Sequence, residues 1–349
     1  MAWQLIDFDA LDEAELDHWQ EVRRSNPALD SPFFHPAFSA AVHSVFGDVV
    51  VARHSSRQVW FPLQVRRRVA RALLTPGSDF QGPIAGPGVE IDPVELVRDT
   101  GLRALRFAFV HGRGSDFEPF VDERLPSPLI DTTGGLPGYL GRVGKAGRHK
   151  MKRVTNKASR ELGEVRLVWD ADDPDLLDRL IGIKRAQYAA TGAYDFFALP
   201  QNRSLVHRLA TTRADGFEGI LSAVYADGEL LAAHFGLRDR DVLHWWFPVF
   251  SREHSHVSPG WLLLRELISA APVNGLGRID LGCGDEDYKM RSMTGEAVVC
   301  GGQVTSSAVQ KELWRARNAA LCRMKASPMW PRLRTAKNRA IKVVHEVGR

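Results

Sequence analysis

Two neighbouring stretches decide the fold of this chain, SPGWLLLRELISAA at residues 258–271 and GRIDLGCGDEDYKM at residues 277–290. In the first stretch the apolar residues recur at helical spacing, which predicts a helix that begins directly after Ser-Pro-Gly. The second stretch opens with a short apolar run typical of a buried strand, and this run leads into three acidic residues followed by Tyr288 and Lys289. Together they predict a helix, a strand and a polar segment at the mouth of that strand.

Three strands are expected immediately upstream, with the sequences GILSAVYA, ELLAAHFGL and VLHWWFPVF. The Asp-Gly pair at residues 227–228 favours a tight hairpin turn between the first two of them. Further upstream, Asp173 and Pro174 suit the N-cap and the first position of a helix. A strand at residues 164–169 and a basic helix over residues 139–162 precede it. This order of elements predicts an α+β fold with a mixed, largely antiparallel sheet.

The N-terminal part of the chain has shorter strand patterns separated by loops. Residues 49–53 and 58–65 read as paired strands, whereas PGSDFQGPIAGPG at residues 76–88 is too rich in Gly and Pro for regular structure. The segment DTTGGLPG at residues 131–138 has the composition of a linker, so a boundary is expected there. The expected parts are an N-terminal half, a C-terminal half and a basic helical tail, at residues 1–136, 137–310 and 311–349.

The composition is that of a globular protein with an apolar core, because 44% of the 349 residues are hydrophobic and 25% are charged. The first residues have neither the basic start nor the apolar run of a secretory signal. No apolar run approaches the ~20 residues that span a bilayer. The three cysteines lack the spacing of a metal site or a disulfide framework. We therefore expect a cytoplasmic protein without a bound metal.

Positive charge is concentrated in two segments. Residues 311–349 hold eleven Lys or Arg against two Glu, a net charge of +9, so residues 1–310 carry −5 of the total of +4. Residues 142–160 hold eight Lys or Arg and no acid. Such runs are most often solvated helix faces, but they also bind nucleic acid, anionic lipid or phosphorylated ligands. The tail is accordingly a candidate for peripheral contact with the inner face of a membrane.

The expected helix that starts at Ser258-Pro259-Gly260 has the features of an anion site. Its first N–H groups have no partner within the helix, and the helix dipole adds positive potential at the same end. Gly260 has no side chain to obstruct a ligand. A pyrophosphate group fits such a site, although most helix N-termini bind only water.

With these elements the sequence resembles the acyltransferase domain of the CelD/BcsL family, which belongs to the GNAT superfamily and is related to the FemAB/FemX transferases. The resemblance rests on the basic helix, the three-strand meander, the Ser-Pro-Gly helix start and the pattern D-x-x-x-G-x-x-x-Y-K, here Asp280, Gly284, Tyr288 and Lys289. Residues 31–42 and 78–84 also match the N-terminal half of that family. One departure is Leu-Gly-Cys at residues 281–283, where the family has a bulkier residue after the Asp.

The resemblance implies two GNAT-like halves that face each other across a cleft. It implies that acetyl-CoA or another short acyl-CoA is the co-substrate, bound in the C-terminal half. The pyrophosphate would lie near Val257, Ser258, Pro259 and Gly260, and the thioester would lie between VLHWWFPVF and RIDLGCG. Trp246 would then line the acyl site together with Phe247, and such bulky rings favour a short acyl group.

Attack of an amine on a thioester requires a base and a group that stabilises the oxyanion. By resemblance, Lys289 with its neighbour Tyr288 is the first candidate for binding a phosphate or stabilising developing charge. His234 and, after it, His244 are candidate bases on adjacent strands, although a lone strand histidine is usually structural. The carboxylate alternatives are Asp280 and Asp285. Cys283 is a much weaker candidate nucleophile, because direct transfer requires none.

Three functions are compatible with these features. The first is acyl transfer to an amine of a small molecule, phosphorylated or not, such as a sugar, a precursor of the cell envelope or exopolysaccharide, or a specialised metabolite. The second is a FemX-like transfer from aminoacyl-tRNA, in which the basic segments would bind RNA. The third is a non-catalytic role in a polysaccharide- or membrane-associated assembly, with the tail as anchor. No local motif identifies the acceptor.

Overall fold

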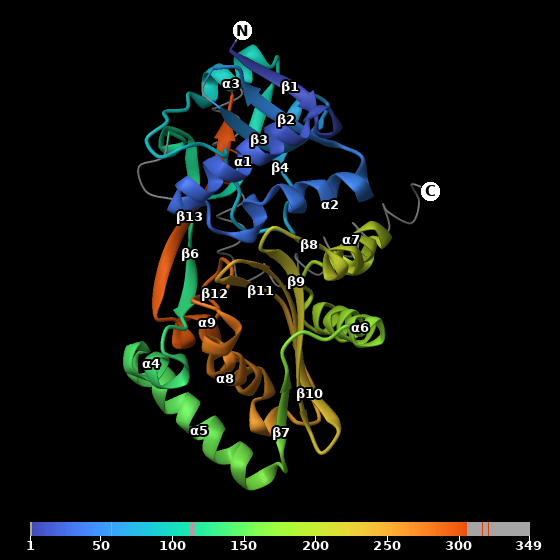
Figure 1. The fold of residues 1–349 in the computed structure, drawn as a ribbon, viewed down its shortest axis with the longest axis vertical. Helices are drawn as coiled ribbons and strands as arrows, with labels where there is room; N and C mark the ends of the chain where they lie inside the picture. Colours follow the sequence, from blue (N-terminus) through green and yellow to red (C-terminus); the bar gives the residue numbers. More distant parts are fainter. Residues whose placement is uncertain (1, 57, 112–115, 306–315, 317–319, 321–349) are drawn as a thin grey trace.

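A computed structural model describes residues 2–56, 58–111, 116–305, 316 and 320 (Figure 1). The described strands form one sheet in the order β1-β2-β3-β4-β5-β13-β6-β12-β11-β10-β9-β7, and β8 pairs with β9. The strands are β1 (Trp3–Asp7), β2 (Val49–His54), β3 (Val59–Arg66), β4 (Val69–Ala72), β5 (Ala104–His111), β6 (Val121–Asp131), β7 (Val165–Val168), β8 (Arg213–Ala214), β9 (Phe217–Ala226), β10 (Glu229–Asp239), β11 (Val242–Phe250), β12 (Arg278–Asp280) and β13 (Gly295–Val304). The helices are α1 (Glu13–Ser25), α2 (Pro36–Phe46), α3 (Pro93–Asp99), α4 (Gly135–Arg142), α5 (Lys145–Glu161), α6 (Pro174–Thr191), α7 (Pro200–Thr211), α8 (Pro259–Ala270) and α9 (Asp287–Ser292).

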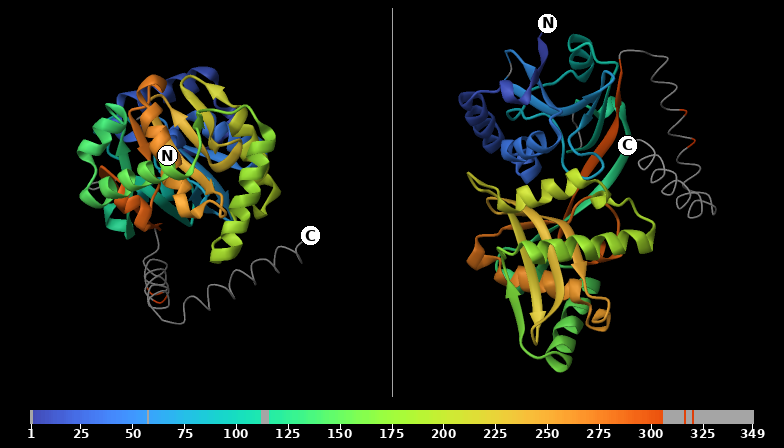
Figure 2. Two further views of the ribbon diagram at one scale, coloured as in Figure 1. Left: turned by 90° about the horizontal axis from the view of Figure 1, so that it is seen from below. Right: turned by 90° about the vertical axis from the view of Figure 1, so that its right-hand side faces the viewer.

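Two groups of strands lie one above the other along the long axis of the molecule (Figures 1 and 2). The upper group is β1 to β5, in which β1 to β4 run antiparallel and β5 is parallel to β4. The lower group is β12, β11, β10, β9 and β7. Strand β13 inserts between β5 and β6, and β6 also pairs with β12. A strand late in the chain therefore completes the upper group.

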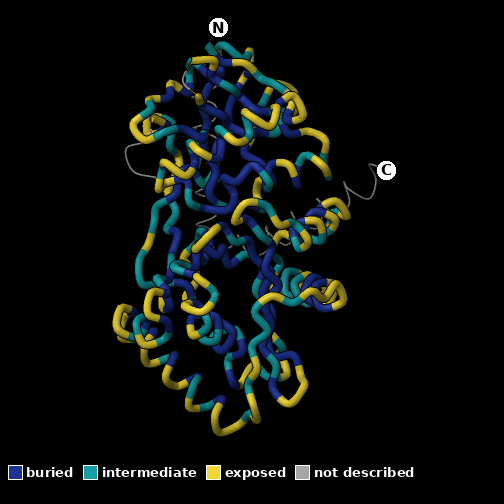
Figure 3. Tube along the Cα trace, viewed as in Figure 1, coloured by how far each residue is buried: buried dark blue, intermediate teal, exposed yellow. Residues whose placement is uncertain are grey.

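Helices cover both faces of the lower strands. Helices α6 and α7 pack on one face, where their leucines join an apolar cluster that also contains residues of α2 and β2. Helices α4, α5 and α8 pack on the other face around a second cluster. The strands are therefore buried on both sides, whereas the outward faces of α5 and α6 are exposed (Figure 3).

The pairing of β11 with β12 is short. The two strands are parallel and pair over three residues each, ending at His244 opposite Asp280. Strand β11 then continues to Phe250, while β12 ends. The chain beyond β12 thus diverges from β11, and this divergence positions the candidate site described below.

The expected α+β class with a mixed sheet is confirmed, including the paired β2 and β3 and the meander of β9, β10 and β11. The expectation of one basic helix over residues 139–162 was wrong, because α4 and α5 are separate and Val143 between them is extended. Residues 131–138 are not a free linker either, since β6 ends and α4 begins within them. The expected helical tail lies outside the described residues, except for residues 316 and 320.

The expected boundary between the two halves, at residues 136 and 137, remains a prediction. The sheet itself runs across both proposed halves, because β13 pairs with β5 and β6. Among the described helices, none is long and apolar enough to cross a membrane.

A buried ion pair ties α1 to β10. The guanidinium of Arg23 contacts both carboxylate oxygens of Asp239, and both side chains are fully buried. Arg23 also donates to Gln20, at 2.8 Å. Burial lowers the pKa of Arg23 and raises that of Asp239, and the charge of each residue shifts the pKa of the other in the opposite direction.

Replacement of Arg23 by Met should lower the free energy of unfolding by about 3–5 kcal/mol, because it leaves Asp239 buried without its counter-charge. Urea denaturation measures this. Arg24→Met is the control, since Arg24 pairs with Asp215 at the surface and its loss should cost at most about 1 kcal/mol. Adding Asp239→Leu to Arg23→Met should recover much of the loss. If Arg23→Met and Arg24→Met lowered the free energy of unfolding by equally small amounts, the buried ion pair would not have the stabilising role assigned to it.

Candidate active site

Four polar side chains from three segments meet where β11 and β12 diverge. Asp79 comes from the irregular loop between β4 and α3, and His244 comes from β11. Cys283 follows β12, and Lys289 lies in α9. We call these four residues the central cluster. The central cluster thus joins the loop of the N-terminal part to residues 277–290.

His244 is the fully buried member of this cluster. Its Nε2 atom lies 3.1 Å from Asp79 Oδ2, and the ring of Phe33 packs edge-on against it at 4.8 Å. A carboxylate beside Nε2 favours the tautomer that carries its proton there. Within the described structure neither ring nitrogen has a hydrogen bond of regular geometry, and only Nε2 faces the carboxylate, so the lone pair of Nδ1 is left available as a base.

Asp79 holds Cys283 as well. The Cys283 thiol donates to Asp79 Oδ1 at 3.1 Å. Burial, followed by the charge of Asp79, raises the pKa of Cys283 well above its usual range, so the thiol stays protonated. This environment does not suit a nucleophilic thiolate. A Cβ atom at Gly282, where φ is +76°, would come within 2.6 Å of Asp79, so Gly allows this close approach.

Lys289 is buried and fixes the backbone of the same segment. Its ammonium donates to the carbonyl oxygen of Cys283 at 2.9 Å and lies 3.1 Å from Glu286 Oε2. Burial would raise the pKa of Asp79, but contact with His244, the hydrogen bond from Cys283 and the charge of Lys289 lower it on balance. Asp79 is therefore ionised at neutral pH.

The other candidate base, His234, lies beside the central cluster in a different environment. It is fully buried, stacks on Trp245 at 4.3 Å, and its Nε2 accepts the backbone N–H of Trp246 at 3.2 Å. Burial, with the nearby His244, lowers its pKa to about 3, so it stays neutral. Because the Nε2 lone pair of His234 already accepts this hydrogen bond, it is not available as a base.

The remaining predicted catalytic residues are spread around the central cluster. Asp280 is buried and bound by Arg278, which also forms a bidentate pair with Asp30 at 2.7 and 2.8 Å. Burial raises the pKa of Asp280 despite Arg278. Burial, then Glu286, also raises the pKa of Tyr288. Asp285 is exposed to solvent.

The predicted donor residues lie at the N-terminus of α8 and on β11. Ser258 has φ +57° and ψ +62°, which turns the chain sharply into the helix after the buried Val257 and places Pro259 at its first position. Lys150 of α5 donates to Ser258 Oγ at 2.8 Å. Burial and then nearby cations, Arg153 first, lower the pKa of Lys150. One basic side chain therefore contacts this helix start, and further cations lie near that side chain.

Trp246 and Phe247 continue β11 beyond His244. Their rings stack at 4.5 Å, and Phe247 is buried against Phe196 and Phe197. Trp246 Nε1 donates to the carbonyl of Gly77 at 2.7 Å. Because Gly77 precedes Asp79 by two residues, this bond links β11 directly to the loop that supplies the carboxylate.

Three residues near these groups were not among the predicted site residues. Asp79 lies in SDFQGPI, a stretch quoted only for its resemblance, and its role depends on a contact 165 positions away in the sequence. Lys150 lies in the basic run, where spacing alone does not distinguish it from its neighbours. Lys184 lies on α6, and no sequence signal separates it from other helical lysines.

Lys184 is partly buried against β11. Its ammonium donates to the carbonyl of Pro248 at 3.0 Å and lies 5.5 Å from the ring centre of Tyr188. Burial, followed by the charge of Lys289, lowers its pKa from 10.5 to about 8. Lys184 thus adds a second cation close to Lys289 of the central cluster, with a pKa of about 8.

In the described part of the chain, one group of side chains has the spacing of a metal site, namely Asp7, Asp9 and His43. Both aspartates are exposed, and exposed acidic groups are common without a metal. The group belongs to the N-terminal strand region and α2 and contributes nothing to the central cluster.

Replacement of Lys184 by Met should change how stability depends on pH. Since the folded pKa lies below the unfolded value, the unfolded state holds more protons between pH 8 and 10.5, and wild-type stability rises with pH in this window. Relative to Lys184→Met, the wild type should therefore gain about 2 kcal/mol between pH 7 and pH 10. Denaturation at both pH values measures it, with Lys152→Met on exposed α5 as control. If the wild type gained as much stability relative to Lys152→Met, the pH dependence could not be assigned to Lys184.

Residues 145–290 match the family model for the acetyltransferase (GNAT) domain. FemX has a similar fold, with a TM-score of 0.56 and 10% identity over 88% of this chain and 99% of that chain. The C-terminal domain of a protein assigned as a lysylphosphatidylglycerol synthetase in Agrobacterium fabrum gives a TM-score of 0.53 and 12% identity over 88% and 96%. L-PGS from Bacillus licheniformis gives 0.52 and 10% identity over 87% and 96%.

No curated protein sequence matches the chain. The likeness to the three solved structures concerns the fold, and it confirms the expected α+β class with GNAT-like architecture. Residues 145–290, which hold α5 to α8 and most of the central cluster, form a GNAT-type acetyltransferase domain, and the chain is therefore an enzyme of the transferase class.

Proposed function

We propose that this protein transfers a short acyl group, with acetyl as the expected one, from acyl-CoA to an amine of a small molecule. The observation that carries the proposal is the position of the α8 N-terminus, in contact with Lys150, beside a parallel strand pair that diverges. This arrangement lies within residues 145–290, the part that matches the GNAT domain. We also propose that the chain belongs to the CelD/BcsL branch and acts in the cytoplasm on a sugar, an envelope precursor or a specialised metabolite.

The start of α8 is the proposed site for the pyrophosphate of CoA. The helix has twelve residues, so its dipole favours an anion at its start. The N–H groups of Ser258, Trp261 and Leu262 already donate to backbone carbonyls, which leaves the N–H of Gly260 as the one that faces a ligand in this proposal. Lys150 adds a cation that already contacts Ser258 Oγ. A Cβ atom at Gly260 would meet only Phe250, at 3.9 Å, which leaves space for a ligand at this position.

The thioester is proposed to lie in the gap between β11 and the chain after β12. Backbone groups of Trp246 and Phe247 lie past the end of the paired region, so they are not used by β12. The stacked rings of these residues and the neighbouring Phe196 limit the space for the acyl chain. A short acyl group fits this wall best.

His244 is the proposed general base. It is the last residue of β11 that pairs with β12, so it lies where the strands begin to diverge. The amine nitrogen attacks the thioester carbon, its proton passes to His244 Nδ1, and the C–S bond breaks to release the CoA thiolate, which then takes up a proton. Asp79 orients the ring and stabilises its protonated form. The charges of Lys184 and Lys289 favour the oxyanion.

A donor of the aminoacyl-tRNA type is the second candidate, and the structural similarity to FemX favours it. Its acyl group would reach the same cluster, but its RNA would require a larger basic surface. The basic residues of α5 are the described surface that such a partner would use. The non-catalytic alternative predicts neither donor binding nor transfer.

Calorimetric titration with acetyl-CoA tests the donor site. We expect micromolar binding to the wild type and at least a hundredfold loss in Gly260→Glu, because the new carboxylate would repel the pyrophosphate. The same carboxylate at a helix N-terminus favours the helix itself, so the loss would not reflect unfolding. Gly260→Gln is the control of equal size and should retain most of the affinity.

Failure of the wild type to bind any short acyl-CoA would refute the acyl-CoA proposal. If aminoacyl-tRNA bound instead, with affinity falling steeply as salt is raised, the second candidate would replace it. Equal losses in the Glu and Gln variants would mean that Gly260 matters for space and not for charge.

Replacement of His244 by Gln, or of Asp79 by Asn, should lower the turnover rate with an amine acceptor about a hundredfold, because each removes or disorients the base. Binding of acetyl-CoA should stay within a few-fold of the wild type. His207→Gln is the matched control, since His207 pairs with Asp178 at 2.9 Å in the same way but on the exposed side of α7. If both His244→Gln and Asp79→Asn kept full turnover, His244 and Asp79 would have no part in the transfer.

A further inference from the structure

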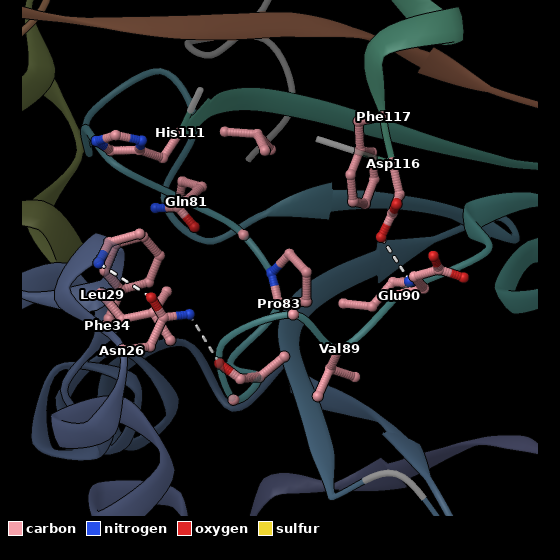
Figure 4. A pocket seen from close by; sticks show the side chains of 17 residues that line it. Asn26, Leu29, Phe34, Gln81, Pro83, Val89, Glu90, His111, Asp116 and Phe117 are labelled. Carbon is pink, nitrogen blue, oxygen red and sulfur yellow. Dashed lines mark hydrogen bonds between the residues drawn. The ribbon is translucent and has the colours of Figure 1, made fainter. Parts of the chain in front are cut away.

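A separate hollow of about 500 Å³ lies in the N-terminal part, close to the central cluster but outside the family match. Three segments form its walls, namely the end of α1 with the turn after it, the Gly- and Pro-rich loop, and the end of β5 with the residues near Phe117 (Figure 4). Its size is within the range of about 300–1,000 Å³ that is usual for small-molecule sites. We call it the N-terminal pocket.

Gln81 supplies the most informative polar group of this pocket. The side chain is 4% exposed, and its Nε2 donates to the carbonyl of Leu73 at 3.2 Å and to Ser78 Oγ at 2.6 Å. A carbonyl can only accept, so the amide nitrogen must face Leu73 and the amide oxygen must face the other way. Figure 4 shows that oxygen turned towards the pocket, where it has no partner in the described structure.

The other charged groups of the pocket are acceptors as well. Glu90 and Asp116 line the opposite wall, and Asp116 Oδ2 accepts the backbone N–H of Ile91 at 2.5 Å. No lysine or arginine is among the described residues that line the pocket. Leu29 and Phe34 provide an apolar wall. A ligand with N–H and O–H donors and some apolar surface is complementary to this lining, and the carboxylate of Asp116 disfavours a phosphate beside it.

Two routes connect the pocket to the central cluster. The ring of Phe80, between Asp79 and Gln81, stacks on His111 of the pocket at 6.1 Å and meets His244 edge-on at 6.5 Å. On the other wall, Leu29 precedes Asp30, which holds Arg278 and through it Asp280 at the end of β12. The pocket and the cluster therefore share their supporting segments.

We propose that the N-terminal pocket binds the acceptor, and that this acceptor is an unphosphorylated amine-bearing polyol, with a hexosamine as its simplest form. This inference rests on the proposed acyl transfer for its role, but the binding itself does not require a donor. Gln81 and Asp116 accept hydrogen bonds from the ammonium and hydroxyl groups. The apolar wall packs against the face of the sugar ring.

Calorimetric titration of the full-length chain with D-glucosamine and D-glucosamine 6-phosphate, without any acyl donor, tests this proposal. We expect the wild type to bind glucosamine at least tenfold more tightly than the phosphate. Gly86→Phe should weaken glucosamine at least tenfold, because the added ring fills the pocket. A Cβ atom at Gly86 makes only an ordinary contact with Val89, at 3.7 Å, so the fold should tolerate it.

Gly141→Phe is the matched control, since Gly141 is exposed on α4 with open space around its Cα atom. It should bind glucosamine as the wild type does. The double variant Glu90→Gln and Asp116→Asn keeps the shape and removes both charges, and it should reduce the preference over the phosphate. Tighter binding of the phosphate, absence of glucosamine binding, or full binding to Gly86→Phe would each overturn the proposal.

The donor titration separates this result from the proposed function. Glucosamine binding that Gly86→Phe abolishes, in a chain that binds no acyl-CoA, would support the pocket and refute the acyl-CoA donor. Acetyl-CoA binding without glucosamine binding would support the acyl-CoA donor and refute the proposed role of the N-terminal pocket.

Discussion

The insertion of β13 between β5 and β6 is the constraint on which the rest of the structure depends. This strand pairs with both neighbours over most of its length, so the two groups of strands form one continuous sheet. The loop that carries Asp79 bridges to β5 at Gln81 and accepts a hydrogen bond from Trp246 of β11 at Gly77. A carboxylate from one part of the chain can then lie within 3.1 Å of both a histidine and a thiol from the other.

Buried charge is used at two places in the junction, with different consequences. Arg23 pairs with both oxygens of Asp239, Arg240 lies 3.9 Å from one of them, and neither Arg23 nor Asp239 has a remaining role that its geometry suggests. Asp79, in contrast, is shared among His244, Cys283 and Lys289, so no single partner satisfies it. Together with burial, this charge raises the pKa of the Cys283 thiol. The thiol stays protonated, and the imidazole keeps a free lone pair on the nitrogen that faces away from the carboxylate.

Much of the C-terminal half could be predicted from the sequence, because its signals are local. The helical spacing after Ser258, the hairpin at residues 227–228 and the N-cap at Asp173 all depend on near neighbours, and each element forms as expected. The pairing of β13 could not be predicted, since strand partners far apart leave no periodic signal. Asp79 was missed for the same reason. The break between α4 and α5 was also missed, because the basic pattern continues across Val143 and Gly144.

The position of β13 at the far end of the described chain has a consequence for the order of folding. Until residue 304 has been synthesised, β5 and β6 each present an unpaired edge, because the strand that belongs between them does not yet exist. The pairing of Val110 with Cys300 joins residues 190 positions apart, and contacts of such high sequence separation form slowly. The N-terminal part therefore cannot complete its sheet as it leaves the ribosome. The last described strand can pair only after both of its neighbours have been made.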